Sequence, residues 1–169
     1  HTRWTGDWSS DVCSSDLDGV LPQMGVMAPK GIAGIVINST DSYALVQSVL
    51  SLNKIKINAS LKKSGYFGTL TWRGDDSRIM HLSDVPKYVP LQVGDTVVTD
   101  GKSAIFPQGI TIGKVSGYEV DSKTGFWDIS VELTEKMGNL SKIYVVKNLK
   151  KAEVQKIQDT LQATIKREK

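Results

Sequence analysis

Cysteine and histidine are almost absent from this chain of 169 residues, which has one cysteine and two histidines. Cys13 and His1 both lie in the first 17 residues, so the rest of the chain has no thiol and only His81. This scarcity excludes disulfides, thiol catalysis and cysteine-ligated zinc there. A lone histidine also argues against a histidine-based triad or metal site. We therefore expect no catalytic residue, no metal site and no cofactor.

Long apolar runs are also lacking. None reaches the roughly 18 residues that a membrane-spanning helix needs. The opening segment HTRWTGDWSSDVCSSDL has neither the apolar run of a secretory signal nor the ligand spacing of a zinc site. Its stretch DWSSDVCSSDL instead matches the translation of a common short-read sequencing adapter. We interpret residues 1–17 as a non-native, adapter-derived segment and exclude them from fold reasoning.

The remaining chain is mildly basic. It holds 20 lysines and arginines against 15 aspartates and glutamates, a net charge of +5. These charges do not gather into the basic stripe that is typical of strong nucleic-acid binders. A length of about 150 residues suits one ordinary domain or two small ones.

Short strands dominate the predicted structure. In 54–65, Ile57, Ala59 and Leu61 alternate with polar residues, which predicts a half-buried strand. A Ser-Gly turn and the run 66–72 complete a hairpin. The segment 42–50 is compatible with helix or strand, and its β-branched content favours strand. The other predicted strands lie within 24–37, 78–82, 93–101, 105–121, 126–134 and 142–148.

This density of strands and turns predicts an all-β fold of two small, mostly antiparallel β-barrel subdomains. We expect the first at 18–62, incomplete in itself and with the last strand as a candidate to complete it. The second is expected at 63–148. The tail 149–169 is charged and carries a narrow apolar stripe at helical spacing, so it is expected to be a short helix or disordered. The stripe consists of Val154, Ile157, Leu161 and Ile165.

Two short motifs could suggest chemistry. The loop RGDD (73–76) carries adjacent carboxylates, but neighbouring side chains point apart and no third ligand stands nearby, which favours a solvated turn. The stretch HLSD (81–84) contains His, Ser and Asp, but triads converge from distant parts of a sequence and no nucleophile-elbow loop is present. A histidine at a strand end followed by a Ser-Asp turn is the simpler interpretation.

Lysines interleaved with aromatic residues leave a nucleic-acid-binding β-barrel as an alternative function, because such barrels combine aromatic platforms with basic grooves. Aromatic residues in small β proteins more often belong to the core or to cross-strand pairs. The aromatic residues are Tyr66, Phe67, Trp72, Tyr88, Phe106, Tyr118, Phe126 and Trp127, and the lysines are at 54, 56, 62, 63 and 87.

Several phrases of the sequence resemble the family of the rod shape-determining protein MreC. MGVMAPKGIAGIVINST (24–40) is similar to its glycine-spaced opening, and LKKSGYFGTLTWRGDD (61–76) to its hairpin. The most specific match is LQVGDTVVTDGKSAIFPQGITIGKV (91–115), in which Asp100 stands where the family commonly has serine. IYVVKNL (143–149) is similar to the segment that ends the family's β region. The resemblance covers roughly residues 18–149.

The resemblance implies a non-enzymatic scaffold of the cell-wall elongation machinery, with two β-barrel subdomains outside the cytoplasm. It implies a single-pass anchor in the inner membrane and a dimerising coiled coil, both preceding the part present here. The implied partners are MreD, a class B penicillin-binding protein and, indirectly, MreB, with no nucleic acid. Within this frame, Tyr66, Phe67 and Tyr88 are predicted partner contacts.

Overall fold

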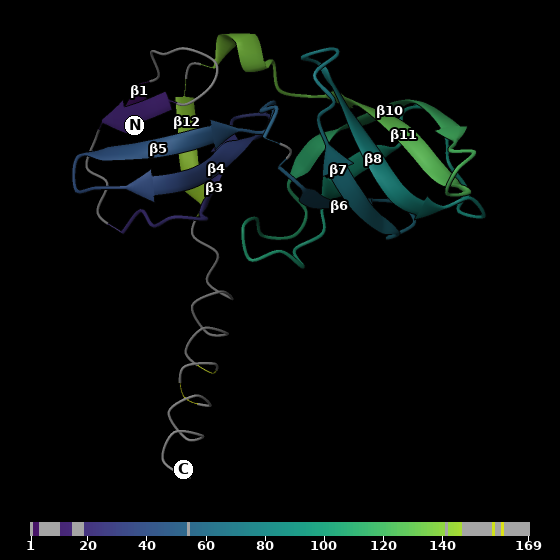
Figure 1. The fold of residues 1–169 in the computed structure, drawn as a ribbon, viewed down its shortest axis with the longest axis horizontal. Coiled ribbons are helices and arrows are strands. Elements are labelled where there is room, and N and C mark those ends of the chain that lie inside the picture. Colours follow the sequence, from purple (N-terminus) through teal and green to yellow (C-terminus); the bar gives the residue numbers. More distant parts are fainter. Residues whose placement is uncertain are drawn as a thin grey trace.

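The fold was analysed in a computed structural model, which describes residues 2–3, 11–14, 19–53, 55–140, 142–146, 157 and 160. The predicted all-β class is confirmed. The strands form one closed barrel and one open sheet, which lie side by side (Figure 1). Every strand pair is antiparallel among the described residues. Among these residues, no helix is long and apolar enough to span a membrane.

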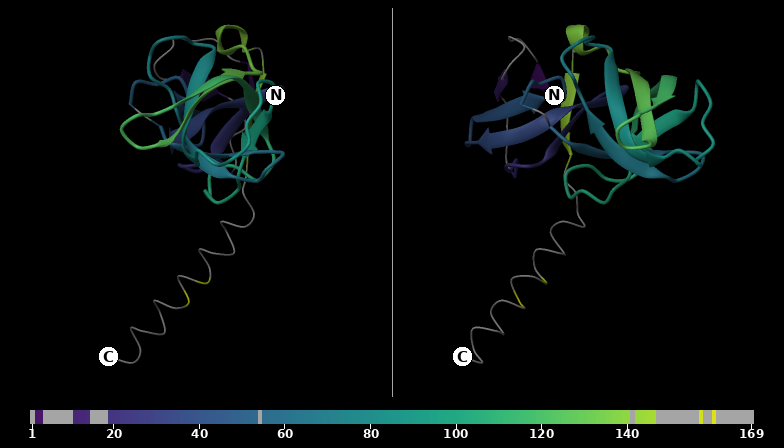
Figure 2. Two further views of the ribbon diagram at one scale, coloured as in Figure 1. Left: turned by 90° about the vertical axis from the view of Figure 1, so that its right-hand side faces the viewer. Right: turned by 45° about the vertical axis from the view of Figure 1, so that its right-hand side comes forward.

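The closed barrel has the strand order β10-β11-β8-β7-β6-β9, and its strands form a ring when viewed along the long axis (Figure 2). Its strands are β6 (Ile57–Leu61), β7 (Phe67–Thr71), β8 (Ile79–Pro86), β9 (Thr96–Thr99), β10 (Thr111–Val120) and β11 (Phe126–Leu133). The register of β10 shifts between Thr111 and Gly113 and again between Val115 and Gly117. Such irregularities bend a strand and help a small sheet to close.

The open sheet is built around β12-β3-β4-β5. These strands are β3 (Gly25–Ala28), β4 (Gly31–Ser39), β5 (Tyr43–Ser48) and β12 (Lys142–Val146). Two further strands, β1 (Thr2–Arg3) and β2 (Asp11–Ser14), pair at its edges with β12 and β5. Both come from the excluded segment 1–17, and because they lie only at the edges, the three pairings among the four central strands do not depend on them. A short 3-10 helix, η1 (Met137–Asn139), precedes β12.

The division between the two units differs from the predicted boundary after residue 62. Strand β6 pairs with β7 and β9 inside the closed barrel, so the chain enters the barrel before Ile57. The reason is the apolar face of β6, because Ile57, Ala59 and Leu61 are all at most 2% exposed. The last strand, β12, pairs with β3 of the open sheet. The tail 149–169 lies outside the described residues except for 157 and 160.

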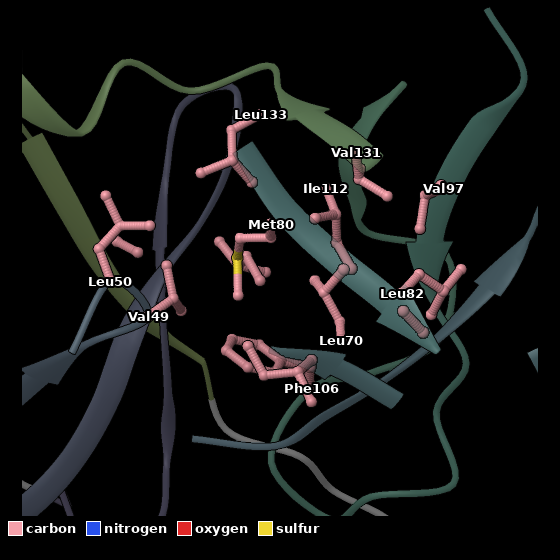
Figure 3. Packing of buried hydrophobic residues seen from close by; sticks show 14 of the residues in the cluster. Val49, Leu50, Leu70, Met80, Leu82, Val97, Phe106, Ile112, Val131 and Leu133 are labelled. Carbon is pink, nitrogen blue, oxygen red and sulfur yellow. The ribbon is translucent and has the colours of Figure 1, made fainter. Parts of the chain in front are cut away.

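One hydrophobic core runs through both units (Figure 3). Val49 and Leu50, which follow β5, belong to the same cluster as Leu70 and Met80 of the barrel. Phe106, which is 1% exposed, comes from the loop between β9 and β10. Its ring packs on the sheet at Gly25, where an added Cβ would lie 2.5 Å from the ring. Sheet and barrel are therefore held together by continuous apolar packing.

Candidate partner-binding surface

The β6–β7 hairpin presents two of the predicted contact residues. Gly65 adopts a φ of 72° at its turn, a conformation that favours glycine. The N–H of Leu61 donates to the carbonyl of Tyr66 at 2.9 Å, which closes the hairpin. Tyr66 and Phe67 follow directly and are 39% and 55% exposed. The turn thus fixes two large aromatic side chains at one end of the barrel.

Tyr66 meets the third predicted residue, Tyr88, across space. Their ring centroids are 5.9 Å apart and the planes cross at 80°, an edge-to-face arrangement. Such pairs stabilise a protein by about 0.5–1.5 kcal/mol in addition to the contribution from the surface they bury. Tyr88 is nevertheless 73% exposed, so most of its ring is open to a partner.

The loop that carries Tyr88 is fixed to the barrel by two other aromatic residues. The indole N–H of Trp127 donates to the carbonyl of Val89 at 3.1 Å, and the hydroxyl of Tyr118 donates to the carbonyl of Leu91 at 3.3 Å. The rings of Tyr118 and Trp127 pack edge to face at 5.2 Å. Tyr88 therefore sits on an ordered loop, which reduces the entropy that a partner would have to overcome.

We call Tyr66, Tyr88, Tyr118 and Trp127 the aromatic patch. The sequence analysis counted Tyr118 and Trp127 among the aromatic residues but assigned them no contact. Each lies on a strand, with Tyr118 opposite Ile129 and Trp127 opposite Val85. Their role depends on which loop folds back over β10 and β11, and no local pattern in the sequence encodes that.

Phe67 is not part of the aromatic patch. It lies on the other side of the hairpin, where the ammonium group of Lys102 stands 3.0 Å from the centroid of its ring. It lines a hollow of about 400 Å³ between the hairpin and the loop after β9. The three predicted residues thus divide between two neighbouring surfaces.

A charged cluster occupies another part of the barrel surface. Arg73 donates to Oδ2 of Asp128 at 2.8 Å. His81 lies between two carboxylates, with Nε2 at 3.4 Å from Asp75 and Nδ1 at 3.5 Å from Asp128. Nδ1 of His81 and Oδ1 of Asp128 form no hydrogen bond at this distance. The RGDD loop is attached to the barrel through Arg73 and Asp75.

The residues of the HLSD motif separate in the fold. The hydroxyl of Ser83 lies 3.3 Å from the carbonyl of Thr69 and 3.4 Å from the carboxylate of Asp84, whereas His81 faces Asp75 and Asp128. The predicted strand end and turn at 81–84 is wrong, because all four residues lie within β8 (Ile79–Pro86). Asp84 has a φ of 68° there, where the register between β8 and β11 shifts. Within the described residues, no group of three or more His, Cys, Asp or Glu side chains could hold a metal ion.

Acid is expected to loosen the turn at 73–78. The side chain and backbone N–H of Arg78 lower the pKa of Asp76 below 3.8, and the backbone N–H groups of Asp76 and Asp75, followed by His81, lower the pKa of Asp75. A lowered pKa in the folded state contributes stability that is present above the unfolded pKa and is lost as the pH falls through the folded pKa. Loosening is therefore expected below about pH 4.

The indole N–H resonance of Trp72 reports on this turn, because that N–H donates to the carbonyl of Asp76 at 2.9 Å. We expect the resonance to shift in a pH titration between about pH 5 and pH 2. Asp76→Asn should remove most of the shift, while Asp121→Asn, which alters a separate turn, should leave it intact. An unchanged titration in Asp76→Asn would contradict this account.

Comparison with protein families gives a match over most of the chain. The family model described as rod shape-determining protein MreC, barrel core, matches residues 14–147. The cell shape-determining protein MreC of Listeria monocytogenes is 32% identical over 131 residues, which cover 74% of this chain and 44% of that protein. The chain therefore spans less than half the length of this curated relative.

Solved structures show the same fold. MreC from Listeria monocytogenes superposes with a TM-score of 0.80 at 23% identity, covering 87% of this chain and 73% of that one. A structure described as the major periplasmic domain of the cell shape-determining filament MreC gives 0.63 at 18% identity, covering 83% and 87%. A chain from the complex between Penicillin-Binding Protein (PBP2) and MreC from Helicobacter pylori gives 0.62 at 16% identity, covering 78% and 81%.

Proposed function

Because the chain belongs to the MreC family of rod shape-determining proteins, we propose that it is a non-enzymatic scaffold of the cell-wall elongation machinery. In this role it maintains rod shape by binding peptidoglycan synthesis proteins outside the cytoplasm. Two likenesses support the proposal. One related domain is described as periplasmic, and MreC of Helicobacter pylori has been solved in complex with PBP2. Family membership favours this function over the alternative of nucleic-acid binding.

The observation that carries the proposal is the exposed Tyr88 on its ordered loop. Tyrosine is enriched among the residues that dominate interface energies, because it supplies a large contact area and a polar end with few rotatable bonds. The edge-to-face contact with Tyr66 limits the freedom of the ring, and Trp127 fixes the neighbouring carbonyl of Val89. We propose that a class B penicillin-binding protein docks on the aromatic patch.

Tyr88→Ala is expected to weaken binding of the extracytoplasmic part of a class B penicillin-binding protein by about 30-fold, which corresponds to about 2 kcal/mol. The reason is the loss of an exposed, pre-ordered ring. Tyr66→Ala should have a smaller effect because that ring is more covered. Affinities of the purified proteins can be measured by surface plasmon resonance.

Tyr144→Ala is the matched control, since Tyr144 is 48% exposed but lies on β12 of the open sheet. Its affinity should stay within about twofold of the parent, as for most residues outside a hot spot. Equal losses in Tyr144→Ala and Tyr88→Ala would place the contact elsewhere, and full affinity in Tyr88→Ala would rule out the aromatic patch.

The remaining family properties concern protein beyond the described residues. We propose MreD as a further partner, an indirect link to MreB, a homodimer formed by a coiled coil, and a single-pass inner-membrane anchor. These proposals rest on the family resemblance. A full-length protein that is monomeric in detergent would argue against the coiled-coil dimer.

A further inference from the structure

The hollow beside Phe67 has features of a binding site separate from the aromatic patch. Its walls come from the β6–β7 hairpin and from the loop between β9 and β10, which are distant in sequence. Phe67 contributes a ring that is 55% exposed, and Val98 of β9 supplies further apolar surface. An exposed aromatic ring in a concave surface is a suitable contact for an apolar side chain.

The loop that forms one wall is rigidly held. Thr99, which is 1% exposed, donates its hydroxyl to the carbonyl of Pro107 at 2.6 Å and accepts from the N–H of Ile110 at 2.9 Å. The N–H of Lys102 donates to Oδ1 of Asp100 at 2.9 Å. Phe106 anchors the same loop in the core. The hollow is therefore pre-formed and does not depend on a partner to order it.

The two lysines around the hollow favour an anionic group. Lys62 and Lys102 both line it, and neither forms an ion pair with a carboxylate among the described residues. The ammonium group of Lys102 covers the ring of Phe67. Asp100 also lines the hollow, and its Oδ2 is buried without a hydrogen-bond partner. Because this oxygen is buried, a ligand in the hollow does not reach it, and the lysines and the ring of Phe67 carry the site.

We propose that this hollow binds an extended segment of a partner protein in which an acidic side chain lies next to an apolar one. The carboxylate pairs with the ammonium groups of Lys62 and Lys102, and the apolar side chain packs on the exposed ring of Phe67. A bare anion would use the lysines but not the ring. The site is independent of the partner proposed for the aromatic patch.

The test uses the 169-residue chain and the peptide Ac-Ala-Leu-Asp-Leu-Ala-NH2. We expect dose-dependent shifts of the amide resonances of Gly65, Phe67 and Gly109 in two-dimensional NMR spectra. Replacing the peptide's aspartate with asparagine should weaken binding about fivefold, and Phe67→Ala about tenfold. Lys102→Gln should weaken it about threefold, because an exposed ion pair contributes little.

Lys123→Gln is the matched control, since Lys123 is an exposed lysine on the β10–β11 turn outside the hollow. It should leave the affinity unchanged. The proposal is overturned if the peptide causes no shifts at millimolar concentration, if the asparagine peptide binds equally well, or if sodium acetate alone produces the full pattern of shifts. A chain that lacks affinity for the penicillin-binding protein but retains these shifts would refute only the function proposed for the aromatic patch.

Discussion

Phe106→Ala is expected to lower the free energy of unfolding by about 3–5 kcal/mol, the range observed when a fully buried phenylalanine is truncated. Phe106 is 1% exposed and packs on the backbone of Gly25, so the cavity would open between sheet and barrel. The loop that holds the residue is fixed by Thr99 and is poorly placed to collapse into the space. Urea denaturation followed by tryptophan fluorescence measures the change.

Phe126→Ala is the control for this prediction. Phe126 is 41% exposed and lies at the start of β11, so its truncation should cost less than about 1 kcal/mol. Because Phe106 links the two units, its variant is also expected to unfold with a broader transition, as cooperativity between sheet and barrel weakens. A midpoint and slope within error of the parent protein would show that Phe106 does not connect them.

Gly68→Ala is expected to destabilise the barrel by about 3 kcal/mol, at the upper end of the usual cost of overpacking. A Cβ at this position would lie 2.1 Å from the carbonyl oxygen of Ser83. That oxygen belongs to the backbone of β8, which pairs with β7. The clash with the added Cβ can therefore be relieved only if the two strands move apart. The thermal midpoint should fall by roughly 6–12 °C, given about 2–4 °C per kcal/mol for a chain of this size.

Gly117→Ala makes the same chemical change where space is available. No atom lies within 4 Å of a Cβ added at Gly117 in β10. The variant should be neutral or more stable by about 0.5 kcal/mol, because alanine reduces the freedom of the unfolded chain. A similar loss of stability in Gly68→Ala and Gly117→Ala would mean that glycine is required for a reason other than the contact with Ser83. Calorimetry of the two proteins decides between these outcomes.

Most of the strands were predictable because their signals are local. The alternation of Ile57, Ala59 and Leu61 with polar residues predicted β6, and the Ser-Gly turn predicted its hairpin with β7. The strand predicted within 78–82 is also present, although β8 continues to Pro86. Each of these signals depends on neighbours within a few residues, so the sequence carries it without the fold.

The division into units was not predictable in the same way. An apolar face on β6 requires burial but does not specify which sheet buries it, so the sequence pattern alone predicts a boundary after residue 62. In the structure, β6 joins β7 and β9, while β12 crosses back to β3. The packing of the whole core determines which strands pair when they are so far apart in sequence. Phe106 belongs to this core, where it connects the two units.

The candidate site shows the same contrast. Local patterns in the sequence predict an all-β chain, the aromatic residues available for contacts and, through motif resemblance, the MreC family. The contacts of Tyr66 with Tyr88 and of Phe67 with Lys102 arise only in the folded chain. Tyr66 precedes β7 and Phe67 is its first residue, so the two neighbours meet different loops. Which loop then lies against each side depends on long-range packing that no short stretch of sequence encodes.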